Sequence, residues 1–125
     1  MIDFIAMNRK VSINLEPGLY NFHSDSATGK TLLVKMVKSI GEKDMVAITY
    51  HDIIMGIDLN KIISGNPKLL ILDRFDLYDE ESVKLEALRD ADCVTIVDYK
   101  TERRFCDFDD TCFVTLDRNQ LEVSL

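Results

Sequence analysis

The residues best suited to chemistry form one stretch, Asn21-Phe22-His23-Ser24-Asp25-Ser26-Ala27-Thr28-Gly29-Lys30-Thr31. A loop of small residues lets successive backbone N–H groups converge on phosphate oxygens, at the positive end of a following helix. In such a loop Gly29 lets a ligand approach the backbone, and the Lys30 ammonium, lying outside the core, reaches the β- and γ-phosphates. The Thr31 hydroxyl would bind Mg²⁺. The stretch therefore predicts a site for a nucleoside triphosphate and Mg²⁺.

The match to the phosphate-binding loop (P-loop) pattern G-x-x-x-x-G-K-[ST] is incomplete, because Ser24 stands where the first glycine belongs. An ordinary strand-to-helix turn with a solvated lysine would contain the same Gly-Lys-Thr tripeptide. If the loop does bind phosphate, its contacts extend over eight consecutive residues: Ser24, Asp25, Ser26, Ala27, Thr28, Gly29, Lys30 and Thr31. The choice between the two depends on the rest of the chain.

A second informative stretch is Lys68-Leu69-Leu70-Ile71-Leu72-Asp73. Four apolar residues followed by an aspartate predict a strand buried on both faces, with a carboxylate at its C-terminal end. Ligands bind at that edge of an open parallel sheet, so we expect Asp73 to hold Mg²⁺ opposite Thr31 and to act with Lys30 in catalysis. The next residue, Arg74, cannot accept a proton. Asp76 is therefore the first candidate to activate water, and Asp98 the second.

The elements that would position these residues alternate along the chain. Buried strands are predicted at 19–23, 45–50, 68–73 and 93–98, and helices after the loop, at 59–64 and at 79–90. Hairpins are predicted at both ends of the chain, from 2–7 with 11–15 (turn at 8–10) and from 113–117 with 120–125. This order predicts one α/β domain over residues 1–125. Its fold would be a three-layer P-loop NTPase sandwich with a mainly parallel central sheet and antiparallel hairpins at both ends.

These motifs resemble those of the ABC-type ATPases, including their SMC and RecF-like branch. Residues 11–30 are similar to the strand, Pro-Gly turn, strand and P-loop that open such domains, and residues 66–73 to the approach to their Walker B aspartate. Residues 76–79 look like the D-loop, 93–98 like the strand of the switch histidine, and 113–123 like the closing hairpin. The resemblance implies ATP as ligand, Mg²⁺ as cofactor and a homodimer or other protein partner.

The chain also departs from that family. Arg74 replaces the catalytic glutamate, no histidine stands near Asp98, and 36 residues between Gly29 and Asn66 leave no room for a helical subdomain. We therefore expect ATP binding with slow or partner-dependent hydrolysis. Two alternatives stay open: a small nucleotide or metabolite kinase that uses arginines such as Arg74, and a non-catalytic interaction module.

Charge and cysteine content narrow the class of protein. The net charge is −7; residues 1–63 carry seven acids and seven bases, and residues 64–125 carry fifteen acids and eight bases. Without a basic stripe, direct binding of nucleic acid is not expected. No apolar run is long enough for a membrane span, and no secretory signal is visible. Three cysteines without a C-x-x-C pair argue against a disulfide framework and a zinc site, so we expect a cytoplasmic protein.

Overall fold

The computed structural model describes residues 1–23, 27–78, 92–99 and 110–125, with side chains omitted at 27 and 28. Its strands are β1 (Ile2–Ala6), β2 (Arg9–Ile13), β3 (Gly18–Phe22), β4 (Met45–Ile48), β5 (Leu69–Leu72), β6 (Val94–Val97), β7 (Asp110–Leu116) and β8 (Gln120–Ser124). Its helices are α1 (Ala27–Ile40), α2 (Tyr50–Ile54), α3 (Leu59–Ser64) and the short 3₁₀ helix η2 (Phe75–Leu77). The strands form one sheet in the order β1-β2-β8-β7-β3-β6-β5-β4.

One half of the sheet is parallel. β3 pairs with β6, β6 with β5 and β5 with β4, all in the same direction. Every residue of β5 and of β6 is buried, as expected for strands covered on both faces. The parallel pairing predicted for these four segments is confirmed, but the segment predicted as a strand at 45–50 ends as a strand at Ile48.

The other half contains the two predicted hairpins. β1 pairs antiparallel with β2 and β7 with β8, while β2 and β8 run parallel to each other. The first turn consists of Met7 and Asn8, whose φ angles of 53° and 62° suit a tight two-residue hairpin turn. The sequence prediction placed this turn at residues 8–10, one residue too late, because Met7 is an unusual residue for positive φ.

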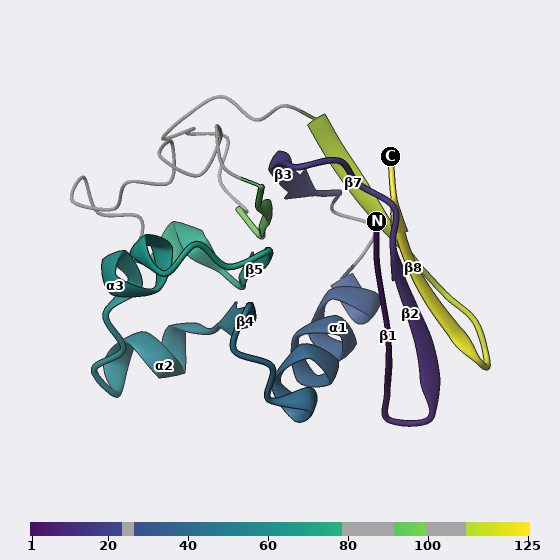
Figure 1. Cartoon of the computed structure of the whole chain (residues 1–125), viewed down its shortest axis with the longest axis horizontal. Coiled ribbons are helices and arrows are strands. Elements are labelled where there is room, and N and C mark those ends of the chain that lie inside the picture. The colour runs from purple at the N-terminus through teal and green to yellow at the C-terminus, as the bar shows by residue number, and fades with distance from the viewer. Residues whose placement is uncertain (24–26, 79–91, 100–109) are drawn as a thin grey trace.

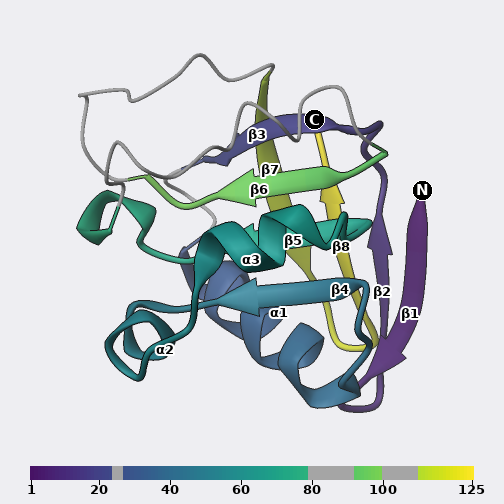
Figure 2. The same cartoon turned by 60° about the vertical axis from the view of Figure 1, so that its left-hand side comes forward.

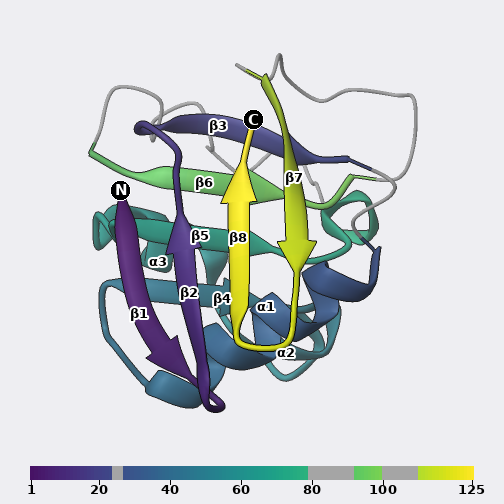
Figure 3. The same cartoon turned by 90° about the vertical axis from the view of Figure 1, so that its right-hand side faces the viewer.

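The predicted fold class, a three-layer P-loop NTPase sandwich, is wrong. The eight strands form one mixed sheet that curls strongly into a half-barrel, and strand exceeds helix in the described residues. The first residues of β7 pair parallel with β3, and its later residues pair antiparallel with β8. β7 therefore joins the two halves, and the C-terminal hairpin lies inside the sheet. Sheet twist accumulates across this junction, so that β7, β8, β2 and β1 run across the direction of the parallel strands (Figure 3).

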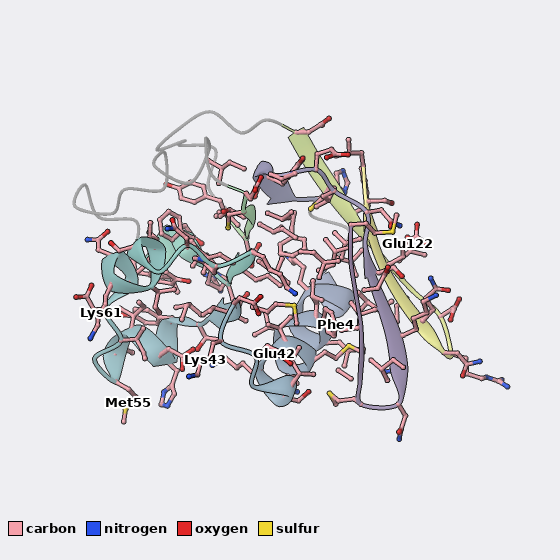
Figure 4. All side chains as sticks on the ribbon, in the orientation of Figure 1. Phe4, Glu42, Lys43, Met55, Lys61 and Glu122 are labelled. Carbon is pink, nitrogen blue, oxygen red and sulfur yellow. The ribbon has the colours of Figure 1, made fainter. Side chains whose placement is uncertain are left out.

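The curled sheet encloses α1, which lies between the parallel strands and the β1–β2 hairpin (Figure 1). Leu33, Met36 and Val37 of α1 are at most 1% exposed and belong to the main core, which also contains Val11 and Leu121. Phe4, labelled in Figure 4, packs against this core from β1. Gly41 ends α1 with a φ of 64°, as the sequence predicts for a helix C-terminus.

The opposite face of the parallel strands carries a second core. α3 lies over β4 and β5 (Figure 2), and its Leu59 and Ile63 pack with Leu70 and Leu72 of β5. The predicted helix at 59–64 is confirmed, including its Asp58 N-cap. The helix predicted at 79–90 lies outside the described residues. In the part of the chain that the structure describes, no helix is both long and apolar enough to cross a membrane.

Candidate functional site

Three of the predicted residues, Lys30, Asp73 and Asp98, lie near the ends of the parallel strands. Lys30 lies in the first turns of α1, Asp98 directly follows β6, and Asp73 directly follows β5. Backbone hydrogen bonds continue past the strand ends, from the Asp98 N–H to Leu72 O at 2.9 Å and from the Asp73 N–H to Ile48 O at 2.9 Å. The ends of β4, β5 and β6 are therefore fixed relative to one another, and both carboxylates lie at the C-terminal edge of the sheet.

Lys30 and Asp98 form a buried ion pair. The Lys30 Nζ donates to Asp98 Oδ1 at 2.8 Å, and the two side chains are 7% and 5% exposed. The expectation that Lys30 lies outside the core is therefore wrong. α1 packs inside the curl of the sheet with its first turns near the end of β6, which puts the ammonium beside a carboxylate 68 residues away in the chain. Sequence reasoning named Asp98 only as a second candidate to activate water and missed this contact.

Asp73 lies at a rigid position. It is half-buried, and its backbone carbonyl accepts a 2.6 Å hydrogen bond from the Tyr78 hydroxyl, which also lies 3.3 Å from Ile48 O. Burial raises the pKa of Tyr78 well above its ordinary value, and the charges of Asp73 and Asp52 raise it further. Tyr78 therefore stays protonated and keeps donating to the strand ends.

Arg74 and Asp76 face each other beside Asp73. Arg74 has a left-handed backbone with a φ of 49°, and its Nε lies 3.7 Å from Asp76 Oδ1. Both atoms are buried and have no hydrogen-bond partner among the described residues. The Asp76 side chain is only 9% exposed. The carboxylate predicted to activate water thus lies next to a guanidinium, with its Oδ1 atom lacking a hydrogen bond from any described residue.

Gly29 serves close packing between α1 and β7. A Cβ at this position would lie 2.5 Å from Val114 Cγ1 and 3.0 Å from Val114 Cβ. Real Cβ atoms do not approach other heavy atoms so closely, so the glycine lets the start of α1 lie against β7. Sequence reasoning assigned Gly29 to ligand approach, and no sequence signal pointed to Val114.

The remaining predicted loop residues are only partly described. Ser24, Asp25 and Ser26 lie outside the described residues, and Ala27 and Thr28 are described as helical backbone alone. Thr31, the predicted Mg²⁺ ligand, is exposed in α1. Immediately before the loop, the ring of His23 stacks on Phe113 of β7 with centroids 4.5 Å apart. This stack was not predicted, since the register between β3 and β7 cannot be read from either segment.

The predicted Mg²⁺ site would have only two protein ligands. Among the described residues, no three His, Cys, Asp or Glu side chains are grouped so as to hold a metal ion. The predicted pair, the Thr31 hydroxyl and the Asp73 carboxylate, would supply two oxygens. Mg²⁺ commonly keeps several waters and takes further oxygens from substrate phosphates, so this donor set suits Mg²⁺ brought by a nucleotide.

The chain matches no family model, no curated protein and no solved structure. The resemblance to ABC-type ATPases therefore stays a prediction.

Proposed function

We propose that this protein binds a nucleoside triphosphate with Mg²⁺, ATP being the first candidate, at the C-terminal edge of its parallel strands. The observation that carries the proposal is the position of Lys30. Its ammonium lies in the first turns of a 14-residue helix that follows a parallel strand, and it contacts the end of β6. Helix N-termini favour anions, and a lysine there adds a full positive charge for phosphate.

The neighbouring groups support Mg²⁺ as part of the ligand. Asp73 ends β5 at the same edge, and Thr31 follows Lys30 in α1. A triphosphate would bridge the lysine and the metal, and the metal would offset the negative charge that the ligand brings near Asp73.

Slow or partner-dependent hydrolysis follows from the groups beside Asp73. Rapid hydrolysis needs a base or a polar group that orients the attacking water. Arg74 cannot accept a proton, and Asp76 faces the Arg74 Nε at 3.7 Å. A homodimer or another protein would then complete the site, as the resemblance implies. Cys93 and Cys112 are buried free thiols, which suits a reducing cytoplasm.

Calorimetric titration with Mg-ATP and Mg-GTP tests the proposal. We expect binding by the wild type and weaker, less Mg²⁺-dependent binding by Thr31→Ala, because the exposed hydroxyl is lost without any change in the core. Lys35→Ala, which removes an exposed charge farther along α1, is the matched control and should bind like wild type. No heat and no thermal shift with either nucleotide would refute nucleotide binding.

One alternative has an observation in its favour. The Lys30–Asp98 pair links α1 to the end of β6, a structural role that a non-catalytic interaction module could also use. Such a module would give no thermal shift with nucleotide. The kinase alternative has no such support, because the Arg74 Nε faces Asp76.

A further inference from the structure

We propose that the Asp98 carboxylate competes with the ligand phosphate for Lys30 and thereby limits the affinity of the site. The inference rests on the proposed nucleotide binding and deepens it, because it names the residue that sets how strongly a phosphate group is held. The Lys30 ammonium has an anionic partner within the chain itself, Asp98 Oδ1 at 2.8 Å. A phosphate must replace that partner or share the ammonium with it.

Asp98 is the fixed member of the pair. Its N–H donates to Leu72 O at 2.9 Å, and its carbonyl accepts from the Phe75 N–H at 2.8 Å. The next residue, Tyr99, donates its N–H to Asn21 Oδ1 at 3.3 Å. Lys30 instead carries its charge on a flexible four-carbon side chain. Exchange of partners therefore requires rotation of Lys30 and leaves β6 in place.

The charges at the sheet edge oppose an incoming phosphate. Asp98 is buried, with Lys30 as its close counter-ion. Among the described residues that directly follow β5, Asp73 and Asp76 add two carboxylates and Arg74 adds one guanidinium. Once a phosphate takes the ammonium, Asp98 loses its partner and repels the ligand across a short distance with little water. Asp98→Asn removes the repulsion, while its amide oxygen still accepts from Lys30.

The test compares Asp98→Asn with wild type by calorimetry, using Mg-ATP and inorganic triphosphate as ligands. Removing one buried like charge beside a bound phosphate should lower Kd by about tenfold or more for both ligands. Asp44→Asn is the matched control: it removes the same charge from an exposed pair with Lys68, at the opposite end of β4. Its Kd should stay at the wild-type value.

The outcomes separate this inference from the proposed function. If wild type binds and folded Asp98→Asn binds equally or more weakly, Asp98 orients Lys30 and does not compete, and nucleotide binding stands. If neither protein binds either ligand, both proposals are refuted.

A measurement on the unaltered protein keeps the test independent of how the variant folds. The carbon-13 resonance of the Asp98 carboxylate should shift during titration with Mg-ATP, because the carboxylate loses the hydrogen bond from Lys30. A resonance that does not move while ligand binds would overturn the competition.

Discussion

Replacing Lys30 by methionine should destabilise the fold itself, in addition to any effect on a ligand. The substitution keeps an unbranched side chain of similar length but leaves the Asp98 carboxylate, 5% exposed, without its counter-ion. Removing one partner of a buried ion pair costs about 3–5 kcal/mol. For a chain of 125 residues, each kcal/mol of lost stability lowers Tm by about 4 °C, because the entropy of unfolding grows with chain length. We therefore expect a loss of roughly 10–20 °C.

Urea denaturation followed by circular dichroism measures this effect as a free energy of unfolding. Lys35→Met, on the exposed face of α1, should change stability by less than about 0.5 kcal/mol. The double variant Lys30→Met/Asp98→Asn should recover much of the loss, because no unpaired charge remains buried. The reasoning is refuted if Lys30→Met alone lies within about 1 kcal/mol of wild type, or if the two single effects simply add in the double variant.

Three further predictions concern other parts of the molecule. Gly29→Ala would favour an exposed helix by about 1 kcal/mol, but here it should destabilise by about 1–2 kcal/mol through its clash with Val114. A Val114→Ala background, which removes Cγ1 but keeps Cβ, should reduce that cost in urea denaturation. A Gly29→Ala variant more stable than wild type would contradict the packing. Burial raises the Asp52 pKa, but hydrogen bonds from Lys38 and the start of α2 outweigh it, so the pKa lies below its ordinary 3.8. Asp52→Asn should thus lower the free energy of unfolding by about 0.5–1 kcal/mol at neutral pH. The difference in stability between wild type and variant, measured by denaturation at a series of pH values, should vanish as the pH falls through the lowered pKa of Asp52. A difference that persists in strong acid would contradict this prediction. Burial raises the pKa of Cys112 to about 12. An alkylating reagent at about pH 8 should therefore modify this thiol only after unfolding, as mass spectrometry would show. Rapid labelling of the folded protein would instead show an accessible thiolate.

The parallel half of the sheet was predictable because its strands carry unambiguous signals. A short apolar run that ends in aspartate, as at 69–73 and 94–98, has few alternatives to a strand buried on both faces. The curl was not predictable. It depends on β7 changing partners between Cys112 and Phe113, and alternating residues there fit an ordinary hairpin equally well.

The same limit applies to the candidate site. Local patterns identify Lys30 and Asp73, since each stands at a recognisable junction between an element and a loop. The contact between Lys30 and Asp98 depends on how α1 is placed inside the curled sheet, which no local pattern contains. α2 was missed because the apolar run 45–50 appears continuous, whereas Thr49 caps a helix that begins at Tyr50.

The parallel pairing of β2 with β8 determines when this chain can fold during its synthesis. Lys10 lies opposite Gln120 and Ile13 opposite Val123, so the β1–β2 hairpin gains its second neighbour only from β8, which is made much later. A two-stranded hairpin alone is marginal in water, and Val11 and Ile13 are fully buried only in the finished sheet. Pairing over so many residues is slow, and the nascent chain exposes these residues until β8 leaves the ribosome. The sheet is therefore completed only after β8 has been made, and until then the β1–β2 hairpin lacks its second neighbour.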